Sequence, residues 1–396
     1  MLRFLTAGES HGPALTVIVE GLPAGLPITE EQIGDELARR RLGYGRGPRM
    51  RFERDEIKIL GGVRHGRTLG SPVAIEILNS EWPKWETEMS AAPGSPSKKL
   101  TQPRPGHADL VGMQKYGFDD ARDVLERASA RETAARVAAG ALAKALLGHL
   151  GIAIVSHVAR IGAVATSHDH RPGPNDLNVV DDSEVRCFDP ATSEAMIAEI
   201  KAAAKEGDSL GGVAEVIAYG VPAGLGSHVH WDRKMDGLLA GALMSIQAVK
   251  AVEIGDGAEQ ATQRGSVAHD AIAVDEENAK SGGFSRRTDH AGGLEGGMTS
   301  GAPLIARVSM KPLASLNRPV LETVDVNTKE STVSFKERTD VTAVPALGVV
   351  AEAMTALVLA SEALRKFGGD SVAEFVRNAD AYIAHLGETP SRALGV

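Results

Sequence analysis

The stretch Val17-Ile18-Val19-Glu20-Gly21-Leu22-Pro23-Ala24-Gly25-Leu26 decides the fold, because a similar stretch occurs later in this chain of 396 residues. Its counterpart is Val216-Ile217-Ala218-Tyr219-Gly220-Val221-Pro222-Ala223-Gly224-Leu225. In both copies a short run rich in β-branched residues ends in a turn of glycine and proline, which is typical of a β-strand, and a helical pattern follows. Each copy therefore predicts the same succession of strand, turn and helix.

A second pair of similar segments follows the first pair in the same order. Residues 66–73, Gly-Arg-Thr-Leu-Gly-Ser-Pro-Val, match residues 297–304, Gly-Met-Thr-Ser-Gly-Ala-Pro-Leu. Turns reuse glycine and proline, so chance could supply either match alone. Two matches in the same order favour an internal duplication, in which similar halves at about residues 1–150 and 210–396 form a single domain around a shared core. The period is far too long for a solenoid.

Helices with recognisable ends lie between these segments. Thr29 and Gln32 fit a capping box, which predicts a helix that ends near Gly43. Ser129 and Glu132 fit a second capping box. Helices are expected at about residues 129–147, 193–206, 232–252 and 345–368, with a last one capped by Asp370. Because strands and helices mix without a strict βαβ rhythm, we predict a mixed α/β fold built in layers.

The composition is that of an ordinary soluble protein, with a hydrophobic share of 43% and a formal net charge of −9. Cys187 is the only cysteine, so no internal disulfide can form and a reducing, cytoplasmic setting is expected. Residues 1–6 lack the apolar core of a signal peptide. The most apolar stretch, residues 345–360, is interrupted by Glu352 and is interpreted as a buried helix rather than a membrane span. Net acidity and few aromatics argue against nucleic-acid binding.

One basic segment stands out in this acidic chain. Residues 39–51 contain six arginines and neither an acid nor a lysine. The predicted helix end can explain the first three, because cations in a last turn complement the helix macrodipole. It does not reach Arg46, Arg49 and Arg51, which lie in a glycine-rich loop. Arginine makes planar, forked contacts with phosphate and carboxylate, so the cluster predicts an anion-binding site.

Two histidines, His11 and His107, lie in glycine-flanked turns. Imidazole exchanges protons near neutral pH, and a neighbouring phosphate would hold it protonated, so both are candidate acids. Ser10 precedes His11, but adjacent residues rarely meet in nucleophile and base geometry, which argues against a hydrolase. Neither residues 168–170 nor residues 228–230 have matching cysteines or carboxylates at metal-site spacing, so we predict no metal.

Other segments could also bind an anion. A helix beginning at Ser129 would offer its amides and dipole to a phosphate, beside Arg127 and Arg131. The glycine-rich residues 292–301 could bring backbone donors to a ligand, and residues 338–340 pair an arginine with an aspartate. These patterns suit an enzyme that acts on a phosphorylated, polyanionic small molecule. They do not identify the reaction.

Several motifs together resemble the chorismate synthase family in its longer bacterial form. They follow the family order over nearly the whole chain, at residues 8–12, 39–49, 104–109, 127–134, 252–257, 291–301 and 338–340. The resemblance implies conversion of 5-enolpyruvylshikimate-3-phosphate to chorismate and phosphate, a trans 1,4-elimination that requires reduced FMN. It also implies an α+β sandwich, with helices between antiparallel sheets, and a homotetramer.

The resemblance assigns roles to individual residues. His11 would give a proton to the leaving phosphate, His107 would protonate the reduced flavin, and Asp340 would act with the flavin in removing the substrate proton. The implied substrate contacts are Ser10, Arg40, Arg46, Arg49, Arg131 and Arg338, of which Arg40 and Arg46 also match positions for NADPH. The implied flavin contacts are Arg127, Ala128, Ser129, Gln247, Ala248, Gly296, Lys311, Pro312, Leu313, Ala314, Ser315 and Arg338.

Two departures from the family pattern put local flavin contacts in doubt. Asp289 stands where the family usually has asparagine, and Leu313-Ala314 replaces a more polar pair. A flavin- or phosphate-binding protein without catalysis is an alternative, although it would be expected to have lost His11 and His107. An RNA-binding protein is another, although Tyr44 is the one aromatic within the arginine run. Because no added reductase domain is visible, an external flavin reductase is the expected partner.

Overall fold

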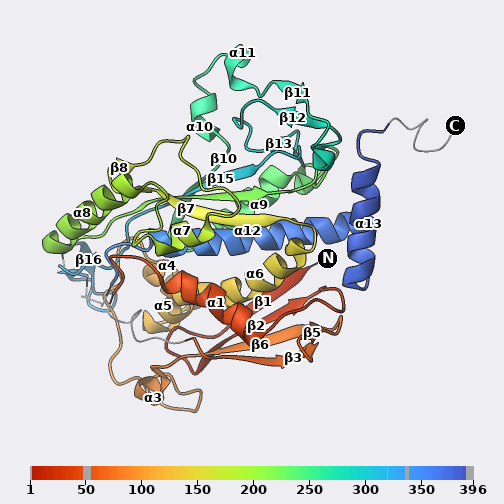
Figure 1. Cartoon of the computed structure of the whole chain (residues 1–396). Coiled ribbons are helices and arrows are strands. Elements are labelled where there is room, and N and C mark those ends of the chain that lie inside the picture. The colour runs from red at the N-terminus through yellow and green to blue at the C-terminus, as the bar shows by residue number, and fades with distance from the viewer. Residues whose placement is uncertain (1, 48–54, 319, 335–338, 389–396) are drawn as a thin grey trace.

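The protein is described by a computed structural model over residues 2–47, 55–318, 320–334 and 339–388. Arg49, Arg51 and Arg338 lie outside these ranges. Two antiparallel sheets enclose a layer of helices, and the three layers are stacked one above another in Figure 1. This arrangement confirms the predicted mixed α/β sandwich.

The first sheet has the strand order β1-β2-β6-β3 and is antiparallel throughout. Its strands are β1 (Arg3–Ala7), β2 (Ala14–Glu20), β6 (Val73–Leu78) and β3 (Ile57–Gly61). Along β6 the residues Val73, Ile75 and Ile77 are fully buried, while the residues between them are half-buried. Because strand side chains alternate between faces, this pattern turns one face of the sheet toward the helices.

The second sheet has the strand order β10-β15-β9-β7-β8 and is also antiparallel. Its strands are β10 (Val249–Ile254), β15 (Leu304–Met310), β9 (Gly212–Tyr219), β7 (Ala153–Ile161) and β8 (Val164–Ala165). The central strands are buried on both faces, unlike those of the first sheet. The outer face is therefore covered by further parts of the chain.

The middle layer contains α1 (Glu30–Arg41), α6 (Thr133–Gly148) and α12 (Val344–Phe367), and α9 (Met235–Met244) packs against α12 and β10. The capping box of Thr29 and Gln32 is present at the start of α1, as predicted. By length and apolar character α12 could cross a membrane, but 89% of its most apolar window is buried inside the protein. It is the central core helix, in agreement with the sequence-based interpretation.

The remaining elements lie around this sandwich. The segment after β10 projects from the second sheet on the side away from the helices (Figure 1). It carries α10 (Gly257–Gln260), α11 (Gly265–Ala268), β11 (Ile272–Val274), β12 (Phe284–Arg286), β13 (Leu294–Glu295) and β14 (Met298–Thr299). The other helices are α3 (Trp82–Trp85), α4 (Asp109–Tyr116), α5 (Arg122–Ala128), α7 (Leu177–Asp182), α8 (Pro190–Glu206) and α13 (Val372–Ala384). The other short strands are β4 (Val63–Arg64), β5 (Arg67–Thr68), β16 (Glu322–Val324) and β17 (Ser331–Val333).

The two sheets share a register that supports the predicted duplication. Val19 pairs with Val73 in the first sheet, and the matching residues Ala218 and Leu304 pair in the second. The Thr68 hydroxyl donates to the Pro23 carbonyl (2.6 Å) and accepts from the Leu26 amide (2.9 Å). The matching hydroxyl, of Thr299, makes the same two contacts with Pro222 (2.7 Å) and Leu225 (2.9 Å).

Strand order also matches, because β1-β2-β6-β3 corresponds to β7-β9-β15-β10. Counted in this way, β7 belongs to the second half, which would begin near residue 153 rather than 210, with residues 164–206 as an insertion. The duplication remains our proposal, in this adjusted form.

Several predicted helix boundaries are wrong. The helix expected from residue 193 begins at Pro190, and Asp189 is its N-cap. The helix expected at residues 232–252 ends at Met244, and β10 follows from Val249. Ala248 separates them with a φ of +65°, a left-handed conformation that a helix cannot contain. The last helix is capped by Ser371, whose hydroxyl accepts from the Glu374 amide, rather than by Asp370.

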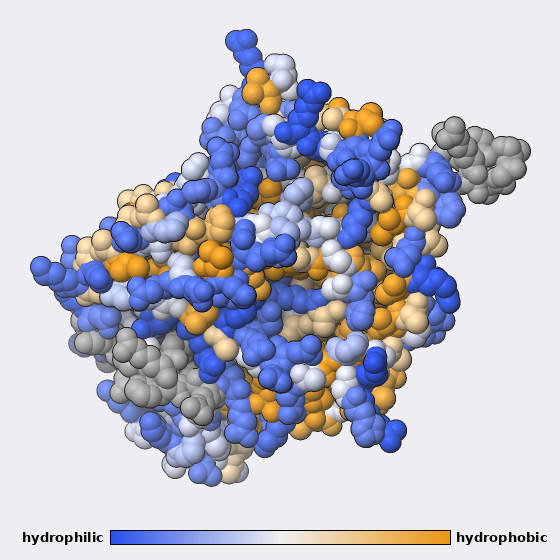
Figure 2. Space-filling model, viewed as in Figure 1, coloured by the Kyte–Doolittle hydropathy of each residue, from blue (hydrophilic) through white to orange (hydrophobic). Residues whose placement is uncertain are grey.

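In the view of Figure 2, hydrophilic side chains cover most of the surface, with smaller apolar areas between them.

Candidate active site

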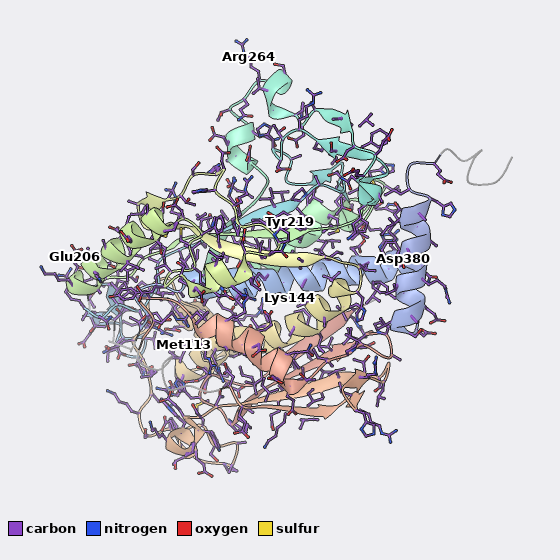
Figure 3. The ribbon with its side chains drawn as sticks, in the orientation of Figure 1. Met113, Lys144, Glu206, Tyr219, Arg264 and Asp380 are labelled. Atoms are coloured by element: carbon purple, nitrogen blue, oxygen red, sulfur yellow. The ribbon has the colours of Figure 1, made fainter. Side chains whose placement is uncertain are left out.

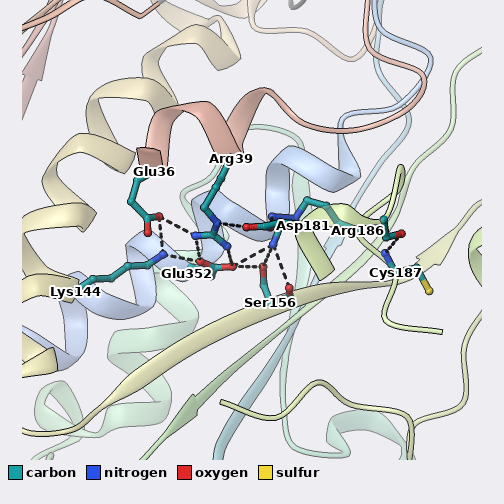
Figure 4. Close-up of polar contacts among 9 residues, drawn as sticks. Glu36, Arg39, Lys144, Ser156, Asp181, Arg186, Cys187 and Glu352 are labelled. Carbon is teal, nitrogen blue, oxygen red and sulfur yellow. Dashed lines mark hydrogen bonds and ion pairs between the residues drawn. The ribbon is translucent and has the colours of Figure 1, made fainter. Parts of the chain in front are cut away.

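The first arginine of the basic run belongs to the core. Arg39 binds Glu352 of α12 (Nη1–Oε2, 2.8 Å) and Asp181 of α7 (Nε–Oδ2, 2.6 Å). Lys144 of α6, which Figure 3 labels in the middle layer, and Arg186 contact the same Glu352 (Figure 4). Buried charges require such partners. Arg39 is therefore a structural ion-pair residue, and the anion-site prediction does not apply to it.

Arg40 and Arg46 lie in different surroundings from Arg39. Arg40 is buried, and its guanidinium donates to the Thr133 hydroxyl (2.9 Å) and to the Ala130 carbonyl (3.0 Å). Arg40 thus reaches the start of α6, beside the segment predicted to bind phosphate. Arg46 forms an ion pair with Asp340 (Nε–Oδ2, 2.8 Å).

Asp340 contacts two neighbouring residues of the basic loop. Besides the ion pair with Arg46, its Oδ1 accepts a hydrogen bond from the amide of Gly47 (2.6 Å). A predicted substrate residue and the predicted catalytic aspartate are therefore in direct contact, although 294 positions separate them in the sequence.

The loop between β1 and β2 is shaped by a glycine. Gly8 has a φ of +102°, and a Cβ at this position would lie 2.4 Å from the carbonyl oxygen of Ala14, so the turn requires glycine. The buried Ser10 donates its amide to the backbone carbonyl of Glu126 (3.0 Å). This contact fixes the loop against the last turn of α5.

Glu126 also binds His11 directly. Its Oε2 lies 2.9 Å from the ring Nδ1 and accepts the backbone amide of His11 at 2.9 Å. Burial alone would raise the pKa of Glu126, but the hydrogen bonds from His11 and the charge of Arg122 outweigh burial and lower the pKa. A charged carboxylate therefore accompanies the imidazole at neutral pH.

Arg131 connects this loop to the capped segment after α5. Its guanidinium donates to Asn79 Oδ1 (3.0 Å) and pairs with Asp55 (Nη1–Oδ1, 2.5 Å). The Asn79 side-chain amide in turn donates to the carbonyls of Glu9 (3.2 Å) and Gly12 (2.7 Å). His11, Ser10 and Arg131 are thus joined through Asn79 and Glu126.

The start of the helix after Ser129 differs from the prediction. The Ser129 hydroxyl accepts from the Arg131 amide (3.2 Å), and residues Ala130–Glu132 form a short 3₁₀ turn before α6. The Glu132 carboxylate does not complete a capping box, because it accepts from Thr6 (2.7 Å) and Gln247 (3.0 Å) instead. The competing tertiary contacts have replaced the local one.

His107 lies in a second carboxylate–histidine pair. Its Nδ1 contacts the fully buried Asp109, and the Arg104 guanidinium binds the other oxygen of Asp109 (Nε–Oδ2, 2.8 Å). Burial alone would raise the pKa of Asp109, but the hydrogen bonds from His107 and Arg104 lower it far below its usual range. Arg104 also donates to the Ser315 hydroxyl (3.0 Å). Lys311 binds the Gly106 carbonyl, so two predicted flavin residues contact the His107 loop.

The predicted flavin residues Arg127 and Gln247 line one pocket. This pocket has a volume of about 370 Å³, within the range of small-molecule sites, and includes Thr6 and Glu132. Within the described ranges, the buried Gln247 Oε1 has no hydrogen-bond partner. An acceptor of this kind fits a ligand that carries an N–H or O–H group.

Ala248 links the two groups of predicted flavin residues. The Lys311 amide donates to the Ala248 carbonyl (3.0 Å), which joins residues 127–129 and 247–248 to residues 311–315. Gly296 lies elsewhere, in the turn between β13 and β14. Its neighbour Gly297 accepts from the amide of Met235 at the first turn of α9 (2.9 Å), whereas Gln247 follows the last turn of that helix. The length of α9, about 15 Å at 1.5 Å per residue, therefore separates Gly296 from Gln247.

Comparisons with known proteins identify the family of this chain. A family model described as chorismate synthase matches residues 2–364. The chain belongs to the chorismate synthase family. The chorismate synthase of Salinispora tropica is 61% identical over 395 residues, covering 98% of this chain and 99% of that protein. The one from Thermobifida fusca is 59% identical over 397 residues, with the same coverage.

A solved structure supports the fold of this chorismate synthase family member. The crystal structure of a chorismate synthase is 42% identical, has a TM-score of 0.79, and covers 98% of this chain and 99% of its own.

Asp289, at the position where the family usually has asparagine, is half-buried, and burial raises its pKa. The charge of Arg171, which also binds Glu215 of β9 (Nε–Oε1, 2.9 Å), acts against this rise in the pKa of Asp289.

Sequence reasoning missed several residues that hold the predicted site together. Direct contacts with predicted site residues are made by Glu126, Asn79, Asp55, Asp109 and Arg104. Asp109 and Arg104 lie in the same motif as His107, so their proximity could have been inferred. For Glu126, Asn79 and Asp55 the sequence holds no comparable signal, because their partners are distant along the chain.

Proposed function

We propose that this chain catalyses the trans 1,4-elimination of phosphate from 5-enolpyruvylshikimate-3-phosphate to give chorismate, with reduced FMN as cofactor. The enzyme is then a carbon–oxygen lyase of the shikimate pathway. The observation that carries the proposal is the pair of carboxylate-held histidines in a family member. His11 is bound by Glu126, which also contacts Arg122, and His107 is bound by Asp109, which also contacts Arg104.

The substrate is an anion, and arginines would bind it. Arg131 and Arg46 are anchored by Asp55 and Asp340, so their guanidiniums are oriented before a ligand arrives. Fixed donors of this kind stabilise negative charge without reorganisation during the reaction. Ser10, Arg40, Arg49 and Arg338 would complete the substrate site, as the family resemblance implies.

His11 would act as the acid for the leaving group. Cleavage of the carbon–oxygen bond builds negative charge on the phosphate, and a proton from the imidazole would offset that charge. Asp340 would accept the proton that leaves the substrate carbon, and its pairing with Arg46 keeps the carboxylate in place. His107 would hold a proton beside the flavin.

Flavin would be bound by Arg127, Ala128, Ser129, Gln247, Ala248 and residues 311–315, with Gly296 and Arg338 as further contacts. The pocket of Arg127 and Gln247, and the unsatisfied Gln247 Oε1, fit such a ligand. When bound, a reduced flavin supplies electron density that stabilises positive character on the substrate ring. NADPH, bound at Arg40 and Arg46, or an external reductase would keep the flavin reduced. A cytoplasmic homotetramer is part of the proposal.

An anaerobic assay tests this function directly. Chorismate formation is followed with 5-enolpyruvylshikimate-3-phosphate and chemically reduced FMN, for the wild type, His11→Ala and His107→Ala. Each variant should lower kcat by roughly 10²- to 10⁴-fold, the usual contribution of a general acid. His385→Ala, at the exposed end of α13, is the matched control and should retain activity. Substrate binding without product in the wild type would contradict catalysis and favour the alternative of a non-catalytic binding protein.

A further inference from the structure

We propose that Glu126 is a positioning residue for His11: its carboxylate keeps a hydrogen on Nδ1 and thereby makes Nε2 the ring nitrogen that donates to the leaving phosphate. The proposal rests on the proposed function, in which His11 is the acid. Glu126 itself would touch neither the substrate nor the flavin.

Three contacts join Glu126 to the His11 loop. The carboxylate accepts from the His11 backbone amide at 2.9 Å and lies 2.9 and 3.0 Å from the ring Nδ1 through its two oxygens. The Glu126 main-chain carbonyl accepts from the Ser10 amide at 3.0 Å. A single residue of α5 thus fixes the backbone of the His11 loop through two amides and binds the imidazole ring at Nδ1.

The chemistry of the two groups then determines the tautomer. An ionised carboxylate can only accept hydrogen bonds, so the hydrogen between it and the ring must be carried by Nδ1. The hydrogen bond made by one imidazole nitrogen decides the protonation of the other, so Nε2 becomes the exchanging site. A carboxylate orients the catalytic imidazole in the same way in serine hydrolases.

Trp85 and Arg122 hold the pair from a second direction. The Trp85 ring lies 4.1 Å from the His11 ring, centre to centre, with 31° between their planes. The Arg122 guanidinium lies over the same indole at 4.9 Å and donates to Glu126 Oε1 at 2.9 Å. Stacking restricts rotation of the imidazole, and Arg122 neutralises a carboxylate that is only 2% exposed.

The tautomer can be measured without any enzyme assay. Long-range ¹H–¹⁵N correlation spectra of ¹⁵N-histidine-labelled protein, recorded through the pH range where the ring becomes neutral, report which nitrogen carries hydrogen, and His11→Gln assigns the signal. We expect Nδ1–H in the wild type. Glu126→Gln should shift His11 toward Nε2–H, because an amide can also donate to Nδ1. Asp123→Asn, on the same helix, is the matched control and should leave the tautomer unchanged.

Turnover supplies the second measurement. Glu126→Gln should lower kcat by about 10- to 100-fold with little change in KM, and Glu126→Asp, which restores a carboxylate, should recover part of it. An unchanged tautomer in Glu126→Gln, or Nε2–H already in the wild type, would overturn the proposal whatever the activity. Full kcat in Glu126→Gln would also overturn it. If the wild type forms no chorismate, the proposed function fails, and the spectra still decide whether Glu126 sets the tautomer.

Discussion

Adjacent arginines at the end of α1 have different tasks. Each residue turns about 100° around a helix axis, so Arg39 points toward Glu352 and Asp181 while Arg40 reaches Ala130 and Thr133. The basic run is therefore divided between the protein core and the proposed substrate site. Composition alone could not make this division, because it depends on which partners surround each side chain.

Cys187 is expected to be unreactive in the folded protein. Its side chain is 2% exposed, and burial raises the pKa of the thiol to about 11. The thiolate, which is the reactive form, is then scarce at pH 8. A disulfide exchange reagent at pH 8 should titrate one thiol rapidly in urea and only slowly in buffer. Equal rates under both conditions would contradict this expectation.

At the scale of elements, the predictions succeeded where local chemistry is strong. The capping box at Thr29 and the extent of α12 follow from residues next to one another in the sequence. The boundary between α9 and β10 was wrong, because the left-handed Ala248 carries no sequence signal of the kind that glycine gives. The interrupted capping box at Ser129 failed because Glu132 has tertiary partners.

The contact between α6 and α12 predicts the effect of a single methyl group. A Cβ on Gly140 would lie 2.3 Å from the Cβ of Ala353, so Gly140→Ala should lower the free energy of unfolding by roughly 1–3 kcal/mol despite the better helix propensity of alanine. Gly148 ends the same helix, and apart from the backbone of that helix no atom lies within 4 Å of its Cβ position, so Gly148→Ala should be neutral or stabilising by less than about 1 kcal/mol. Urea titrations of both variants test the contrast, and equal effects would contradict the close packing.

At the scale of the whole molecule, a buried ion network joins the layers. Glu352 of α12 contacts Arg39 of α1, Lys144 of α6 and Ser156 of β7. Burial alone would raise the pKa of Glu352, but the charges of Arg39 and Lys144 lower it far below its usual range. The network therefore couples the helical layer to the second sheet.

Removing the central charge of this network should be costly. Glu352→Gln leaves buried cations without their shared partner, and we expect a loss of roughly 3–5 kcal/mol in the free energy of unfolding. Glu20→Gln is the control, because Glu20 pairs with Arg3 on the surface, where both side chains are more than half exposed, and the loss should stay below about 1 kcal/mol. A loss as small as that of the control would show that the network does not contribute to stability.

The pKa of a second buried carboxylate predicts how the free energy of unfolding changes at low pH. Glu215 is buried, which alone would raise its pKa, but His157, Arg171 and Arg307 lower the pKa to about 2 from an ordinary 4.5. Because the folded pKa is the lower one, its contribution is fully present above about pH 4.5 and is lost as the pH falls toward 2. The unfolding free energy of Glu215→Gln should therefore fall less steeply than that of the wild type between these pH values. Parallel curves would contradict the assignment.

By itself, the sequence determined the class of fold, the recurrence of strand and turn segments, most helix ends and the residues that carry the family resemblance. These features depend on neighbouring residues or on side-chain chemistry, and both can be interpreted along the chain. Tertiary structure alone decided that Arg39 serves the core, that Glu126 holds His11 and that Asp340 meets Arg46. The partners in these contacts are 313, 115 and 294 positions apart, and only packing of the layers brings them within hydrogen-bond distance.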